Sequence, residues 1–223
     1  MPESLVEIAR TLSVWAVPVL LAVTLHEVAH GWAARWLGDP TAAEQGRLSL
    51  NPLRHVDPVG TVVVPAVLAV LGGFIFGWAR PVPVNMQRLQ QPRRDMALVA
   101  LAGPASNLLM AIGWAWAFRL TLGMAAGDGG ELLRAVCQAG IVINLVLMVL
   151  NLLPLPPLDG SRVLNGVLPE SWARQVDRVE PFGLLILVAL LALGLLGRLL
   201  EPGLQLAGSL VLGLTGLDGV ATP

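Results

Sequence analysis

Residues 25–31 read Leu-His-Glu-Val-Ala-His-Gly, and they lie inside a stretch whose other side chains are mostly apolar. His26, Glu27 and His30 are therefore polar groups within a segment that otherwise has the composition of a membrane-spanning helix. Ionisable groups at membrane depth cost free energy unless a partner compensates them, and they usually mark a functional site. The rest of the chain must supply the groups that compensate these three side chains.

The overall composition indicates an integral membrane protein. The chain has 223 residues, of which 55% are hydrophobic and 13% are charged, and its mean hydropathy is +0.72. Soluble domains carry about 25% charged residues, so this chain has too few to cover a surface that faces water. The net charge of −1 gives no electrostatic basis for binding nucleic acid. Cys137 is the only cysteine, which excludes an internal disulfide and a zinc site built from several thiolates.

Long apolar runs predict several membrane helices, because about 20 apolar residues span a bilayer. The runs cover residues 12–37, 59–78, 96–124, 132–153 and 182–200, and a shorter stretch follows at 204–217. We predict an all-α polytopic membrane protein that forms a single domain over residues 1–223. Its core is expected at about 10–165, with one or two accessory helices at about 180–217 and a polar helix around 170–179.

The spacing of the polar residues in the first run predicts a zinc site. His26 and His30 are four residues apart, so on a helix they project from one face and both imidazoles can reach one metal ion. Glu27 follows the first histidine and is placed to take a proton from an attacking water molecule, as in the H-E-x-x-H pattern of zinc hydrolases. The alternative interpretation is a structural polar patch that bonds to neighbouring helices.

A catalytic zinc ion also needs a third protein ligand and an open position. The candidates by residue type are Asp39, His55, Asp57, Asp128 and Asp159. Asp159 is favoured by its context, because the apolar run ends at Pro154 and a proline-rich stretch then leads to Asp159-Gly160. Irregular backbone at membrane depth is tolerated where protein buries it or where it lines a cavity.

Three ordered motifs resemble those of the site-2 protease family of intramembrane zinc peptidases, in its small bacterial and archaeal form. They are HEVAH at 26–30, AGPASN at 102–107 and NLLPLPPLDG at 151–160, and the resemblance extends over most of residues 20–165. It implies that His26, His30 and Asp159 bind one zinc ion per chain and that Glu27 is the general base. It also makes the region at about 10–165 the catalytic core. No stretch resembles the PDZ or CBS domains of other members.

The resemblance further implies that the substrates are transmembrane segments of other proteins, cleaved in the lipid bilayer. A multi-pass protein in the cell membrane of a prokaryote is expected. The alternatives are a membrane protein that binds or transports zinc without hydrolysis, and an inactive scaffold. Transport would require further acidic or histidine residues along the other apolar runs, which contain almost none.

Three amides in the apolar runs are candidate site residues. Asn144 and Asn151 are seven residues apart and therefore lie on nearly the same face of one helix, and Asn107 lies in the preceding run. We expect Asn151 to steady the substrate carbonyl or the oxyanion. Asn107 and Asn144 are either second-sphere residues of the metal site or hydrogen-bonding residues between helices. His55 is a possible second-sphere residue or reserve ligand.

The positions of the ligands also constrain the topology. His26 and His30 lie in the C-terminal half of the first run, and Asp159 follows the fourth run. Three full crossings in between would place Asp159 at the opposite membrane face, so either residues 59–78 do not cross the membrane or the zinc ion lies at mid-depth. We therefore predict that residues 59–84 enter the membrane and return, as a re-entrant helix and a β-like strand. The edge of that strand is expected to pair with an unwound substrate segment.

Overall fold

The computed structural model describes residues 2–63, 79–124 and 127–218 of the chain, and these residues are helical apart from turns and loops. The α-helices are α1 (Pro2–Trp36), α2 (Thr41–Glu44), α4 (Pro92–Thr121), α5 (Asp128–Asn151), α6 (Asp159–Val167), α7 (Glu170–Asp177), α8 (Glu180–Ala192) and α9 (Leu195–Thr215). Three short turns of other helix types are η1 (Pro52–Arg54), η2 (Pro58–Val63) and η3 (Met86–Arg88). No β-strand is present within the described ranges, so the all-helical prediction is confirmed there.

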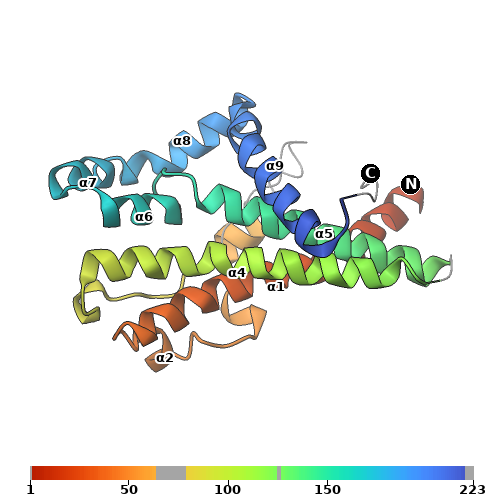
Figure 1. The fold of residues 1–223 in the computed structure, drawn as a ribbon, viewed down its shortest axis with the longest axis horizontal. Helices are drawn as coiled ribbons and strands as arrows, with labels where there is room; N and C mark the ends of the chain where they lie inside the picture. Colours follow the sequence, from red (N-terminus) through yellow and green to blue (C-terminus); the bar gives the residue numbers. More distant parts are fainter. Residues whose placement is uncertain (1, 64–78, 125–126, 219–223) are drawn as a thin grey trace.

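Three helices are long and apolar enough to cross a membrane, and they form the centre of the fold. They are Ala9–Trp36 within α1, Pro92–Thr121, and Gly129–Asn151 within α5, which match the first, third and fourth core runs of the sequence. α1 and α5 run in the same direction, α4 runs antiparallel to both (Figure 1), and each of the three helices packs against the other two. Large apolar side chains face outward, with Leu109 71% and Leu120 77% exposed, as expected for a surface that faces lipid.

Small residues allow these helices to approach closely. Ala111 and Ala115 on α4 are fully buried, and Gly140 of α5 lies directly against the indole of Trp114, where a Cβ atom would collide with the ring. Interfaces rich in small residues are typical of membrane helices, because they bring the two backbones together. α9 packs against both α4 and α5 and completes this hydrophobic core.

The C-terminal apolar region is divided differently from the prediction. The run at 182–200 is not one helix: α8 ends at Ala192, and α9 begins at Leu195 after a bend of 90° (Figure 1). Gly194 has a φ of +67° at the break, a conformation that glycine adopts without steric cost. The stretch at 204–217 is therefore mostly the continuation of α9 and not a separate helix.

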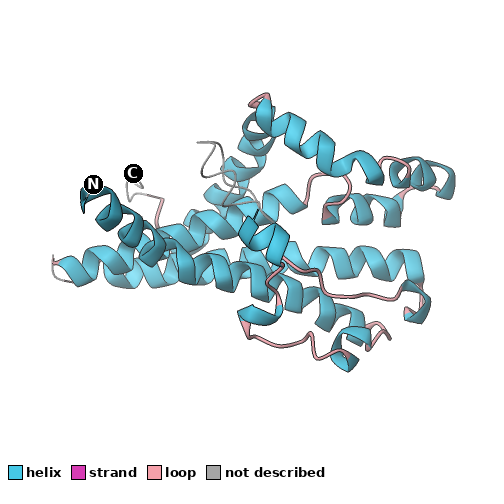
Figure 2. Cartoon of the chain, turned by 180° about the vertical axis from the view of Figure 1, so that it is seen from behind, coloured by secondary structure: helices cyan, strands magenta, loops and turns pink. Residues whose placement is uncertain are grey.

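The connection from α1 to α4 starts and finishes at the same end of the bundle. The N–H of Gln90 donates to the carbonyl of Leu37 at 3.3 Å, and Figure 2 shows the described parts of this connection, residues 37–63 and 79–91, as loops and short helices. The C-terminal half of α1 and the C-terminal end of α5 therefore lie at the same end of the helix bundle. This is the arrangement that His26, His30 and Asp159 need in order to meet at one membrane depth. The middle of the predicted re-entrant segment, residues 64–78, lies outside the described residues. Residues 79–85 are an extended coil and not a strand.

Asp39 fastens this coil to the end of α1. Its buried carboxylate accepts hydrogen bonds from the N–H and the hydroxyl of Thr41, and from the N–H of Asn85 at 2.6 Å. Burial alone would raise the pKa of Asp39, but these hydrogen bonds outweigh it and hold the pKa below the ordinary value. The carboxylate is therefore ionised at neutral pH and fixes residue 85 beside α2.

We expect Asp39→Ala to lower the thermal unfolding midpoint of the purified protein, because two backbone donors lose a charged acceptor. Hydrogen bonds to charged groups contribute about 1.5–3 kcal/mol each. The contribution of Asp39 is present at neutral pH and is expected to fade as the pH falls through its lowered pKa.

Glu44→Ala is the matched control for this prediction. Glu44 also joins α2 to the segment that precedes α4, through an exposed ion pair with Arg88 of η3 at 2.7 Å. Exposed ion pairs contribute little to stability, so its unfolding midpoint should change less than that of Asp39→Ala. Equal shifts for the two variants would contradict the role assigned to Asp39.

Candidate metal centre

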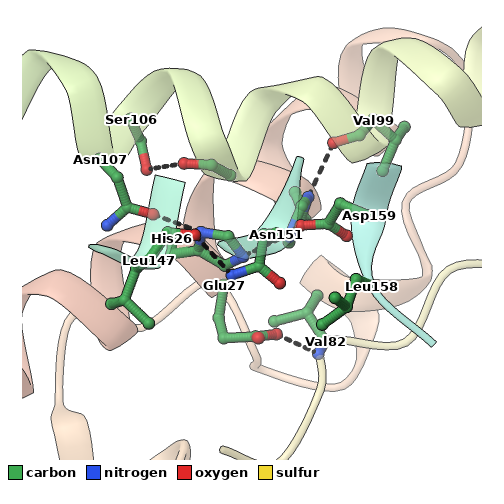
Figure 3. A network of polar contacts seen from close by, with 12 residues as sticks. His26, Glu27, Val82, Val99, Ser106, Asn107, Leu147, Asn151, Leu158 and Asp159 are labelled. Atoms are coloured by element: carbon green, nitrogen blue, oxygen red, sulfur yellow. Dashed lines mark hydrogen bonds and ion pairs between the residues drawn. The ribbon is translucent and has the colours of Figure 1, made fainter. Parts of the chain in front are cut away.

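Two imidazoles of α1, from His26 and His30, meet the carboxylate of Asp159 beside α4. Figure 3 shows His26 and Asp159 at this point. The Nε2 atoms of His26 and His30 are 3.0 Å apart, and each lies 3.2 Å from Oδ2 of Asp159. The three residues are 7%, 9% and 9% exposed. Within the described part of the chain, they are the one group of three or more His, Cys, Asp or Glu residues whose ligand atoms lie close enough to share a metal ion.

The local sequence explains how each ligand reaches this point. The four-residue spacing places both imidazoles on one face of α1. Asp159 is the first residue of α6, and the turn at 152–158 brings it back from the end of α5. A Cβ atom at Gly160 would collide with the carbonyls of Leu152 and Leu153, so a glycine is required where the turn folds against the helix end.

Hydrogen bonds to the outer ring nitrogens determine which atoms face the centre. His26 Nδ1 contacts Oδ1 of Asn107 at 2.6 Å, and His30 Nδ1 contacts the carbonyl of Val99 at 2.7 Å. The orientation of the Asn107 amide is fixed because its Nδ2 donates to Oδ1 of Asn144 at 2.9 Å. Both partners of the imidazoles are acceptors, so each Nδ1 carries the hydrogen and each Nε2 presents a lone pair to the centre.

This donor set fits a zinc ion. Two imidazole lone pairs and a carboxylate oxygen face one another at about 3 Å, an arrangement that is repulsive without a cation between them. Oδ2 of Asp159 is buried and has no hydrogen-bond donor among the described residues. Ligand atoms at about 2.0–2.2 Å from a tetrahedral zinc ion lie about 3.3–3.5 Å from each other, close to the separations found here.

Gly103 of α4 lies directly against the two imidazoles. A Cβ atom at this position would lie 2.5 Å from Cε1 and Nε2 of His30 and 2.6 Å from Cε1 of His26. A glycine in a membrane helix, such as Gly103 within the AGPASN motif, is typical of close helix packing in general. The contact with the histidine rings depends on where α1 and α4 cross, and the sequence alone does not reveal that crossing point.

A cavity of about 140 Å³ adjoins the three ligand atoms. Besides His26, His30 and Asp159, the lining includes Glu27, Pro81, Val82, Val84, Asn151 and Arg162. Glu27 Oε2 accepts a hydrogen bond from the N–H of Val82 at 2.7 Å (Figure 3). Asn151 donates to the carbonyl of Leu147 at 2.9 Å. A carboxylate and an amide thus face the same cavity as the metal ligands.

The amides of Asn107 and Asn144 bond between helices and also support the site. Both residues are fully buried, and Asn144 Nδ2 in turn donates to the carbonyl of Gly140 at 2.8 Å. One chain of hydrogen bonds therefore runs from His26 on α1 through Asn107 on α4 to α5. Such outer contacts fix the orientation of a ligand ring. From the sequence, these amides were either second-sphere residues of the metal site or hydrogen-bonding residues between helices. In the structure, the same two amides have both contacts.

The other candidate ligands lie elsewhere. The 2%-exposed ring of His55 donates from Nε2 to the carbonyl of Ser49 at 2.8 Å, and His55 is absent from the described lining of the cavity. Asp57 accepts hydrogen bonds from the N–H groups that follow it, and Asp39 holds the coil described above. Asp128 begins α5, at the opposite end of that helix from Asn151. The structure therefore does not bring these residues to the metal centre.

The chain is similar to known proteins of one family. The sequence profile of peptidase family M50 matches residues 124–194. The chain is 39% identical over 197 residues to YwhC of Bacillus subtilis, which is named as a candidate zinc metalloprotease, and the match covers 85% of this chain and 84% of YwhC. No solved structure matches the chain.

Mycobacterial proteins named Rip2, which bear the same description, are also similar. Rip2 of Mycolicibacterium smegmatis is 33% identical over 183 residues, with 80% of this chain and 66% of Rip2 covered. Rip2 of Mycobacterium tuberculosis H37Rv is 33% identical over 175 residues, with 77% and 63% covered. The chain therefore belongs to peptidase family M50, the site-2 protease family, and is a zinc metalloprotease.

Proposed function

We propose that this metalloprotease hydrolyses peptide bonds within or near transmembrane segments of other membrane proteins, at one zinc ion held by His26, His30 and Asp159. The observation that carries the proposal is the meeting of these ligands with Glu27 at one cavity, among three helices that are apolar enough to span a bilayer. The bacterial sources of its relatives favour the cell membrane of a prokaryote as its location.

The chemistry divides between the metal ion and the chain. A zinc ion at these ligands supplies Lewis acidity, which polarises a peptide carbonyl and acidifies water. Glu27 accepts the proton of the attacking water and then delivers it to the nitrogen of the leaving amine. Oε2 of Glu27 accepts the hydrogen bond of the Val82 N–H, and no described residue donates to the other oxygen, which can take part in this transfer.

Asn151 is placed to hold the substrate carbonyl. Its Nδ2 group has two hydrogens, one of which bonds to the carbonyl of Leu147. Because Asn151 also lines the cavity, the second hydrogen can donate to the carbonyl oxygen as negative charge develops on it. Asn107 and Asn144 act more remotely, by keeping the His26 ring in the orientation that directs Nε2 to the metal.

The size of the cavity bears on the form of the substrate. An intact helix is about 10–12 Å in diameter with its side chains, and its carbonyls are already hydrogen-bonded. A cavity of about 140 Å³ is too small to admit such a helix. The substrate segment must therefore unwind locally before a peptide bond reaches Glu27 and the metal ligands.

Glu27→Gln tests the assignment of the general base. We expect cleavage of a panel of single-span membrane proteins in liposomes to fall by about 100-fold or more, the usual contribution of a general base. Zinc content should stay at the wild-type value, because residue 27 is not among the three ligands. Wild-type cleavage by this variant would refute the proposed mechanism.

Asp159→Ala tests the third ligand. Without its carboxylate the two imidazoles alone hold the metal, so the zinc content after dialysis should fall well below one ion per chain. Asp57→Ala is the matched control, since Asp57 was a candidate from sequence but bonds to local backbone. Loss of zinc from the Asp57 variant, with zinc retained in the Asp159 variant, would show that the wrong carboxylate is assigned.

Gly103→Ala tests the close contact between α4 and the imidazoles. The new methyl group would overlap both rings and displace them, and misplacement by about 1 Å can cost about 100-fold in rate. Gly113→Ala is the control on the same helix, because no atom lies within 4 Å of its added Cβ. Cleavage and zinc content should fall in the first variant only; equal behaviour of the two would contradict the contact.

A further inference from the structure

One backbone N–H group faces the carboxylate of Glu27. It belongs to Val82, which stands between Pro81 and Pro83 in the coil that lines the cavity. Proline has no backbone N–H, so residues 81–83 offer a single donor. That donor bonds to Oε2 of Glu27 at 2.7 Å, across 55 residues of sequence (Figure 3). Pro83 also limits the backbone conformations open to Val82, because the residue before a proline is restricted.

Residues 80–85, here called the strap, are fastened on both sides of this donor. The N–H of Arg80 donates to the carbonyl of His55 at 2.9 Å. The guanidinium of Arg47 donates to the carbonyls of Arg80 at 2.7 Å and Pro81 at 3.4 Å. Beyond Val82, the N–H of Asn85 donates to Asp39. His55 and Asp39, which do not reach the metal centre, therefore hold the strap.

The strap also lies close against α1, next to the histidine motif. A Cβ atom at Gly31 would lie 3.0 Å from Cγ1 of Val82 and 2.5 Å from Cδ2 of Leu48. Gly31 is four residues after Glu27 and so shares its face of the helix. The final residue of LHEVAHG thus provides the space that brings the Val82 backbone within reach of Glu27.

We propose that the strap positions the general base: the Val82 N–H holds Oε2 of Glu27 in the cavity and leaves Oε1 to receive the proton. This proposal rests on the proposed role of Glu27. A free glutamate side chain has several rotamers, and a hydrogen bond to its carboxylate selects one of them before substrate arrives. Val82 and, through the strap, Arg47 are therefore positioning residues, and the proline-valine-proline sequence is the device that places one donor there.

Comparison of Val82→Pro with Val82→Ala in the full-length protein tests the donor. Both variants lose the valine side chain, but only Val82→Pro loses the N–H. We expect kcat of Val82→Pro on single-span membrane proteins in liposomes to be at least about tenfold below that of Val82→Ala, a difference of about 1.4 kcal/mol in activation free energy. KM and zinc content of Val82→Pro should be within about twofold of those of Val82→Ala, because the donor acts on the chemical step and not on substrate or metal binding.

The same pair of substitutions in the Glu27→Gln protein separates positioning from substrate binding. If the donor acts through Glu27, the residual rates of Val82→Pro and Val82→Ala should differ by less than about twofold in that background. An equal fall in both backgrounds would overturn the proposal. A higher kcat for Val82→Pro would also overturn it, because the hydrogen bond would then restrain Glu27 in an inactive position.

Arg47→Met provides an independent test that leaves the Val82 backbone intact. It removes the donors that hold the carbonyls of Arg80 and Pro81 and keeps a side chain of similar length. We expect kcat to fall by about threefold or more at unchanged zinc content; wild-type kcat would overturn the role of the strap. If the strap variants keep their kcat while the Glu27→Gln protein is inactive, the positioning proposal is wrong and the proposed function stands. If the Glu27→Gln protein cleaves at the wild-type rate, both are wrong.

Discussion

The rest of the structure depends on one constraint, which is that Nε2 of His26, Nε2 of His30 and Oδ2 of Asp159 meet at 3.0–3.2 Å. α1 and α5 must run in the same direction for their C-terminal ends to share a depth. Because α4 lies antiparallel between them in the chain, the segment from α1 to α4 must return to the end at which α1 finishes, and the contact of Gln90 with Leu37 shows that it does. The turn at 152–158 and Gly160 then bring the carboxylate back to the two imidazoles.

The constraint also explains how polar groups persist inside apolar helices. Each imidazole has one nitrogen bonded to α4, through Asn107 or the carbonyl of Val99, and one nitrogen directed at the metal position. Asn144 completes the hydrogen bonding of Asn107, and Glu27 is bonded to the backbone of Val82. Groups that are costly in lipid as isolated side chains are thereby paired within a network joining α1, α4 and α5.

The parts of this arrangement that were predictable from sequence are those set by local spacing. His26, Glu27 and His30 follow from helix periodicity, and the proline-broken context singled out Asp159 from five candidates. Asn107 remained ambiguous, because an amide in a membrane helix can join helices, support a ligand or do both. The break at Gly194 was missed, since a glycine in an apolar run is compatible with a continuous helix until packing selects a positive φ.

The contacts that could not be predicted depend on how elements cross. Gly103 has the same sequence context whether it faces a neighbouring helix or two imidazole rings, and only the crossing of α1 and α4 decides between them. The Val82 N–H is likewise an ordinary donor in a proline-rich loop until the strap is fastened at Arg47 and Asp39. Neither the contact of Gly103 nor the Val82 N–H can be inferred from periodicity or motif spacing. Both nevertheless contact residues of the HEVAH motif.

The central claim is that the histidine pair of α1 and the carboxylate of Asp159 form one zinc site. Zinc K-edge X-ray absorption of the purified protein measures this most directly, because it reports the atoms bound to the metal. The account predicts two imidazole nitrogens together with oxygen ligands, all at about 2.0–2.2 Å. A sulfur ligand at about 2.3 Å, which only Cys137 or a methionine could supply, or a site with fewer than two imidazoles would contradict it.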